Sequence, residues 1–123
     1  MSVPKRFDPA AFCSAVERRD ADSQLAFYAE YAQVRLMSRE RPSDGTSTLV
    51  GPQIREWVVA RCADHRVTYD VVFRWTESDE VMLTEECTRP DGTSALSASR
   101  INLSGDRIAE QTVVVIEDTS DVD

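Results

Sequence analysis

The chain has 123 residues, of which 41% are hydrophobic, 29% charged and 7% aromatic. This length and composition are typical of one globular domain and exclude a disordered tail, a collagen-like rod and a membrane span, because no apolar run approaches about 18 residues. Its 14 basic and 22 acidic residues give a formal net charge of −8, which argues against sequence-independent binding to nucleic acid. We expect a single domain over 1–123, with an ordered core over roughly 7–117 and frayed ends.

Two short helices are expected first. Asp8-Pro9 is typical of an N-cap followed by proline at the first helical position. Asp22 or Ser23 can cap a second helix. The inner face of that second helix is expected to carry Leu25, Tyr28 and Ala29.

A strand, a loop and a third helix follow. The alternation over 31–37 is typical of a strand, and the Pro, Gly, Asp and Ser residues of 38–48 predict a loop. Gly51-Pro52 begins the third helix. One apolar face at helical spacing is formed by Ile54, Trp57, Val58 and Cys62.

Four strands are predicted in the second half, over 67–76, 81–88, 94–103 and 108–116. Short turns separate them, with Pro90-Asp91-Gly92 the strongest hairpin signal. Such short connections make the four strands antiparallel neighbours. The sheet must bury one face against the helices, so the sequence predicts an α+β fold.

The cysteines and the histidine favour an intracellular protein without a metal. Cys13, Cys62 and Cys87 are odd in number and unpaired in spacing, which predicts buried free thiols rather than disulfides. The N-terminus lacks the apolar segment of a secretory signal, so we expect a cytoplasmic location. His65 is the sole histidine and no Cys/His pair has ligand spacing, so no zinc site is expected. The four glycines form no phosphate-binding motif, and no cofactor is expected.

The order of elements and several short motifs resemble the nuclear transport factor 2-like (NTF2-like) superfamily, which includes SnoaL-like polyketide cyclases, ketosteroid isomerases and limonene epoxide hydrolases. The matching segments run through nearly the whole chain: Arg19-Asp20, Leu25-x-x-Tyr28-Ala29, Leu49-Val50-Gly51-Pro52-x-Ile54-Arg55-x-Trp57, and 104–111. The resemblance implies a cone: a curved antiparallel sheet packed on three helices of the N-terminal half (a cystatin-like α+β barrel) that encloses a pocket.

The family's catalytic positions do not carry their usual residues in this chain. The isomerase tyrosine falls at Phe12, its general base at about Leu36, and its second acid at Ser99 or Ile101. The aspartate that cyclases and epoxide hydrolases carry on the last strand falls at about Val113, and the hydrolase Arg-x-Asp falls near Glu85-x-Cys87. None of the known catalytic constellations is therefore present.

Strand alternation and the resemblance together predict a mostly apolar pocket with a few polar points. Glu85 is the candidate catalytic residue, because a carboxylate among apolar neighbours is able to act as a general acid or base. The alternative is that Glu85 points to solvent beside Glu86. Gln111 is expected to donate to a ligand carbonyl or to bond a neighbouring backbone group. The expected ligand-binding set is Phe12, Tyr28, Trp57, Tyr69, Phe73, Ser99 and Gln111.

The last strand is apolar on both faces, so something must cover the outer face of the sheet, and a two-fold partner is the simplest candidate. Three functions remain open. The first is a small enzyme of isomerase, cyclase or hydrolase type acting on a small hydrophobic or polyketide-like metabolite. The second is a non-catalytic binder of an apolar small molecule, and the third is a dimeric protein-interaction domain.

Overall fold

Helix α1 (Pro9–Glu17) and helix α2 (Ala21–Leu25) open the fold. Asp8 caps α1, its side chain accepting from the Ala11 N–H at 3.1 Å, as the sequence predicts. Asp20 caps α2 in the same way, so that helix begins two or three residues earlier than a cap at Asp22 or Ser23 would allow. Because α2 ends at Leu25, Tyr28 does not lie on a helix but begins the first strand.

Helix α3 (Pro52–Ala63) is the long helix of the fold. Gly51 precedes it at φ +54°, a left-handed conformation that glycine adopts without strain. The predicted apolar face is confirmed: Ile54 and Val58 are buried, and Trp57 and Cys62 are half-buried.

Within the described residues, six strands form one sheet in the order β2-β1-β6-β5-β4-β3. Their bounds are β1 Tyr28–Ser38, β2 Ser47–Val50, β3 Thr68–Glu77, β4 Glu80–Thr88, β5 Ser94–Ser104 and β6 Arg107–Asp118. The last four strands pair in antiparallel fashion, as the short turns require. β1 runs antiparallel to β2 but parallel to β6, so the sheet is mixed rather than wholly antiparallel.

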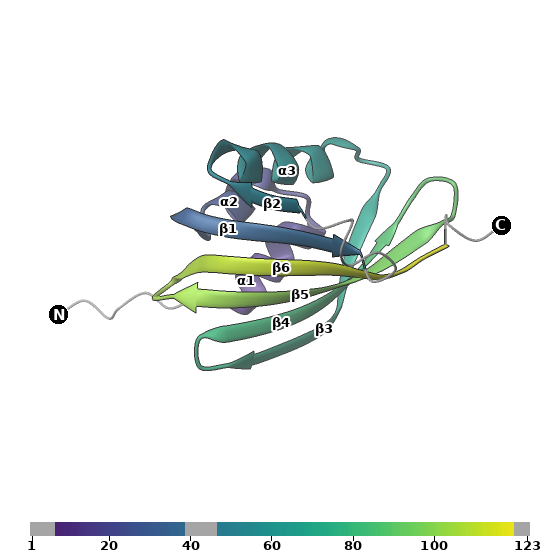
Figure 1. Ribbon diagram of the computed structural model, residues 1–123. Coiled ribbons are helices and arrows are strands. Elements are labelled where there is room, and N and C mark those ends of the chain that lie inside the picture. Colours follow the sequence, from purple (N-terminus) through teal and green to yellow (C-terminus); the bar gives the residue numbers. More distant parts are fainter. Residues whose placement is uncertain (1–6, 39–46, 120–123) are drawn as a thin grey trace.

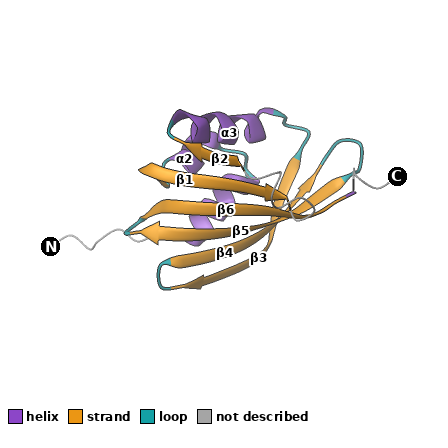
Figure 2. Ribbon diagram, in the orientation of Figure 1, coloured by secondary structure: helices purple, strands orange, loops and turns teal. Residues whose placement is uncertain are grey.

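The computed structural model describes residues 7–38 and 47–119, and most of the predicted 38–48 loop lies outside them. The helices lie on one side of the curved sheet, and its other side carries no helix (Figures 1 and 2). The core between the layers consists of buried apolar side chains from strands β1, β4, β5 and β6 and from helices α1 and α3, with Phe12, Val34, Val58, Leu83 and Ile101 at its centre. No helix within 7–38 or 47–119 is long and apolar enough to cross a membrane.

A bulge in β3 changes which side chains face the helices. Val71 pairs with Glu85, but the next pair along the two strands is Phe73 with Thr84, so Val72 is the extra residue. The Val71 N–H, free of the ladder there, donates to the Glu17 carboxylate of α1 at 3.1 Å. Beyond the bulge every side chain of β3 points to the opposite face from the one that unbroken alternation predicts.

Candidate functional site

Glu85 lies on the inner face of β4 and is only 5% exposed, whereas the adjacent Glu86 is exposed. Its register partners are Val71 on β3 and Ser97 on β5. The interpretation that Glu85 points into solvent is therefore wrong, because the strand is not shifted by one residue. A buried carboxylate requires a partner, and Glu85 accepts a hydrogen bond from Arg61 Nη2 at 2.6 Å.

Arg61 reaches this site from the last turns of α3. Its guanidinium carbon lies 4.9 Å from the ring centroid of Trp57 and 5.0 Å from that of Tyr69. The Tyr69 hydroxyl in turn donates to the Arg61 carbonyl at 3.0 Å, which ties β3 to the helix. Burial alone disfavours the charged guanidinium, but the Glu85 carboxylate and the Tyr69 phenol outweigh it and raise the pKa of Arg61. The side chain therefore remains a cation.

A second polar group lies deeper on the same face of the sheet. The Tyr28 hydroxyl donates to Gln111 Oε1, and Gln111 Nε2 donates to Ser99 Oγ at 3.2 Å. All three side chains are at least nine-tenths buried. Burial raises the pKa of Tyr28, so this phenol is neutral at physiological pH and acts as a hydrogen-bond donor.

Ser99 lies between the two polar groups in the sheet register. It pairs with Leu83 and Val113, one inward-facing position along the strands from the Glu85–Ser97 pair. Ser99 and Glu85 are therefore diagonal neighbours on one face, with Cβ atoms about 7 Å apart. Ser99 Oγ accepts from Gln111, and its own hydrogen has no acceptor among the described residues.

Seven of the eight predicted site residues face the interior, but they divide into three groups. Glu85, Trp57 and Tyr69 surround Arg61, and Tyr28, Gln111 and Ser99 form the hydrogen-bonded chain.

Phe12 forms the third group, as a core residue. Its ring packs against Phe7, Phe27 and Tyr28, with centroids 5.7, 5.4 and 6.3 Å away, and it is 2% exposed.

Phe73, the eighth residue, does not belong to the site. It is 54% exposed and lies on the outer face, beside Thr84 of β4. The prediction assumed strict alternation from Tyr69 to Trp75, and the bulge at Val72 reverses that alternation.

Sequence reasoning missed Arg61, although a signal for it exists. Arg61 falls seven residues after Ile54 and four after Trp57, within the apolar face of α3. A charged residue inside such a face requires a buried partner or a ligand.

The inner face is incompletely covered around Glu85. Two neighbouring sets of cross-strand partners, one of which contains Glu85, include inward-facing side chains that are half-buried rather than buried. They are Leu36 of β1, Ser97 of β5 and Val113 and Val115 of β6. Trp57, Arg61 and Tyr69 are half-buried as well. The inner face is therefore less completely covered at this end of the cone than in the packed core.

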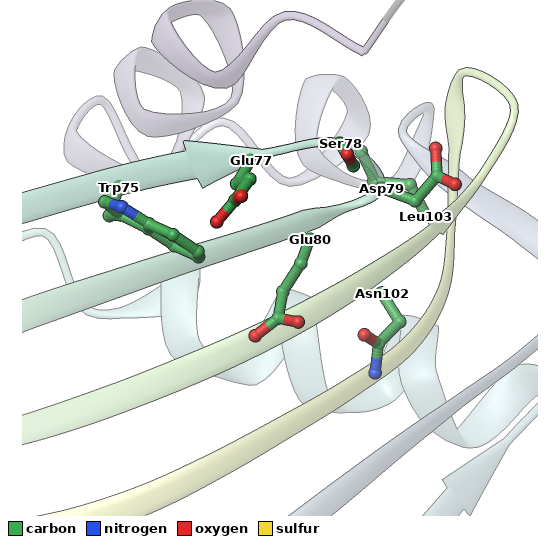
Figure 3. Close-up of a pocket in the computed structure, with 7 residues that line it drawn as sticks. All are labelled: Trp75, Glu77, Ser78, Asp79, Glu80, Asn102 and Leu103. Carbon is green, nitrogen blue, oxygen red and sulfur yellow. The ribbon is translucent and has the colours of Figure 1, made fainter.

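Surface grooves are found elsewhere on the molecule. One of about 320 Å³ lies at the turn between β3 and β4, where Trp75, Glu80 and Asn102 of three adjacent strands point to the same face (Figure 3). A groove of about 400 Å³ runs between α1 and the bulged part of β3. Neither groove is lined by Glu85 or Arg61, so neither belongs to the inner site.

The described residues contain no group of three or more His, Cys, Asp or Glu side chains placed to hold a metal ion. The three cysteines are free, as the sequence predicts, with Cys13 buried and the other two half-buried. Burial raises the pKa of each thiol, which keeps these side chains neutral and weakly nucleophilic.

No family model matches this sequence, and no curated protein matches it significantly. Solved structures do match. An NTF2-like protein of unknown function from Mesorhizobium loti superposes with a TM-score of 0.75 at 15% identity, over 86% of this chain and 85% of the other. A Sinorhizobium meliloti protein provisionally named a polyketide cyclase gives 0.64 at 17% identity, over 84% and 89%.

A third structure, from Catenulispora acidiphila, is a hypothetical protein with a ketosteroid isomerase-like fold in complex with trimethylamine. It gives a TM-score of 0.60 at 14% identity, over 85% of this chain and 81% of the other. At these identities the comparisons establish the fold alone. The chain therefore has the NTF2-like cone fold that its sequence motifs indicate.

Proposed function

We propose that this chain is a small enzyme that performs acid–base chemistry on a small, mostly apolar carbonyl compound, with Glu85 as the general base. The observation that carries the proposal is the buried Glu85–Arg61 pair beside half-buried apolar side chains on the inner face. An apolar site with a few convergent polar groups is the usual composition of a small-molecule site.

Glu85 has one oxygen free for this role. Only Oε2 accepts from Arg61, and the other oxygen has no partner among the described residues. Among those residues, Arg19 Nε alone is both sealed from solvent and without a hydrogen bond, so the second oxygen of Glu85 is accessible. A ligand on the inner face is able to present a C–H group to it.

The proposed step conserves charge within the site. Glu85 removes a proton from the carbon next to the ligand carbonyl, and the C–H electron pair forms the C=C bond of an enolate. The negative charge thus moves from Glu85 to the ligand oxygen, where Arg61 remains to stabilise it. Return of the proton to the same carbon gives exchange, and return to a different carbon gives isomerisation.

Deuterium exchange tests this function without knowledge of the natural substrate. A panel of cyclic and aryl ketones is incubated with the protein in D2O, and loss of the α-proton signal is followed by NMR. We expect the wild type to accelerate exchange of at least one ketone, Glu85→Gln to abolish that acceleration, and Glu86→Gln to retain it. Acceleration that survives Glu85→Gln would remove Glu85 from the reaction, and no acceleration with any ketone would contradict the proposal.

A non-catalytic binder is the second candidate, and it is favoured by the hydrogen bonds that the site residues make with one another in the absence of a ligand. Tyr28, Gln111 and Ser99 hydrogen-bond one another, and one nitrogen of Arg61 pairs with one oxygen of Glu85, so the site is held in place without a ligand, while the other oxygen of Glu85 and the other nitrogens of Arg61 remain for binding. Binding of a ketone with no exchange above the rate in buffer is the result this candidate predicts.

A further inference from the structure

Arg61 is more than a counter-ion for Glu85, because most of its hydrogen-bonding capacity is unused. A guanidinium has five N–H donors, and only one side-chain hydrogen bond of Arg61, from Nη2 to Glu85, is present among the described residues. None of its other nitrogens is sealed from solvent without a partner, and the side chain is 23% exposed. Unused N–H groups of a positioned guanidinium are therefore accessible to solvent or to a ligand.

The position of that guanidinium is fixed before any ligand arrives. The rings of Trp57 and Tyr69 lie against it at 4.9 and 5.0 Å, and Glu85 holds one edge. Arginine suits such a place, because its planar cation stacks on aromatic rings and is weakly hydrated. A ligand oxygen that meets these donors incurs little reorganisation cost.

The net charge of the Arg61–Glu85 pair determines whether a carbonyl oxygen or a carboxylate oxygen binds to these donors. Arg61 and Glu85 sum to zero, so a ligand carboxylate would bring an uncompensated negative charge into a half-buried site next to the Glu85 carboxylate. An uncharged carbonyl oxygen accepts the same hydrogen bonds without that repulsion. The half-buried apolar side chains farther across the same inner face, Val113 and Val115 of β6 and Leu36 of β1, suit an uncharged organic body.

We propose that Arg61 and Glu85 together act as a specificity device: Arg61 binds the carbonyl oxygen of an uncharged, mostly apolar ligand, and Glu85 excludes carboxylates. This inference rests on the proposed function only in that a small molecule occupies the inner face. It requires no turnover. Arg61 is thereby assigned as a ligand-binding residue, and Trp57 and Tyr69 as its positioning residues.

The test compares two probes of matched size, 4-fluoroacetophenone and 4-fluorobenzoate, by fluorine NMR titration of the full chain. For the wild type we expect the ketone to bind at least about tenfold more tightly than the carboxylate, which corresponds to repulsion of about 1.4 kcal/mol. Glu85→Gln leaves the guanidinium uncompensated, so the preference reverses and benzoate gains about tenfold or more. Glu86→Gln, a charge change of the same size on the outer face, leaves the preference unchanged.

Arg61 variants supply a second arm should Glu85→Gln not fold. Arg61→Lys keeps the charge pair and is expected to keep the preference for the ketone, with weaker binding. Arg61→Met removes the donors and is expected to lose measurable ketone binding. The proposal is overturned by equal wild-type binding of both probes, by an unreversed preference in folded Glu85→Gln, by full ketone affinity in Arg61→Met, or by no binding of either probe to any variant. A ketone that binds with the expected preference but is not exchanged contradicts the proposed reaction and leaves this inference standing.

Discussion

At the scale of the residue, the Glu85–Arg61 pair shows what the burial of a single carboxylate requires. Glu85 comes from the middle of β4 and Arg61 from α3, 24 residues earlier, and their contact joins sheet and helix across the interior. The sequence indicates that Glu85 is an unusual residue on an inner face, but not which cation meets it. That choice depends on where α3 lies over the sheet, and spacing within a single element does not determine it.

Removal of one member of this pair is expected to cost more stability than removal of both. Arg61→Met leaves Glu85 buried without a partner, and we expect the free energy of unfolding to fall by about 3 kcal/mol. In the double variant Arg61→Met, Glu85→Met no buried charge remains, so most of the loss is recovered. Urea denaturation followed by tryptophan fluorescence measures both values. A double variant no more stable than the Arg61→Met single variant would contradict this account of the pair.

At the scale of the element, the sequence predicts helix caps and turns, but it does not predict bulges or which strands pair. Asp8-Pro9 and Gly51-Pro52 mark their helices correctly because capping is a local interaction. The bulge at Val72 depends on the Glu17 carboxylate of α1 receiving the Val71 N–H, a contact between residues 54 positions apart. The three successive apolar residues Val71, Val72 and Phe73 were its sole local sign. The parallel pairing of β1 with β6 is equally non-local.

The cap of α2 makes part of the free energy of unfolding depend on pH. The Asp20 carboxylate accepts from the Ser23 hydroxyl at 2.6 Å and from the Ser23 N–H at 3.1 Å, and these bonds lower the pKa of Asp20 below its ordinary value of 3.8. Because the folded-state pKa is the lower one, this contribution is fully present above the unfolded-state pKa. It is lost as the pH falls through the folded-state pKa.

Asp20→Ala is therefore expected to destabilise the protein at neutral pH, and the penalty is expected to shrink below about pH 4. Urea unfolding of the wild type and the variant at several pH values measures the difference. Asp22→Ala serves as the control, because Asp22 is an exposed carboxylate in the first turn of the same helix. A penalty for Asp20→Ala that is the same at acidic and neutral pH would show that the carboxylate charge plays no part in the cap.

At the scale of the whole molecule, the outer face of the sheet stands out because it exposes apolar side chains that the helices do not cover. The helices leave it bare (Figure 2), and it exposes Phe73 (54%), Trp75 (40%) and Met82 (39%). Trp75 and Met82 are direct cross-strand partners, and Phe73 begins a row that continues through Thr84, Ala98 and Val114. The bulge that removes Phe73 and Trp75 from the inner site is what adds them to this patch. Contiguous exposed apolar area on a folded domain marks an interaction surface.

We propose that a second copy of the chain covers this face in a two-fold dimer. A two-fold interface brings one patch against its own copy, and a specific interface needs about 800 Å² from each partner. A net charge of −8 on each chain opposes the association, so we expect the dimer to strengthen as the salt concentration rises.

Sedimentation at several protein and salt concentrations tests this prediction. We expect the wild type to sediment with twice the 13.8 kDa mass of the chain, and Trp75→Glu and Met82→Glu each to shift the equilibrium to monomer. Val59→Glu places the same charge on α3, at a residue that is 43% exposed but lies off the sheet, and is expected to leave the dimer intact. A wild type that stays monomeric at every concentration would contradict the dimer and leave the apolar row to another partner, whereas dissociation by Val59→Glu as complete as by Trp75→Glu would place the dimer interface away from this face.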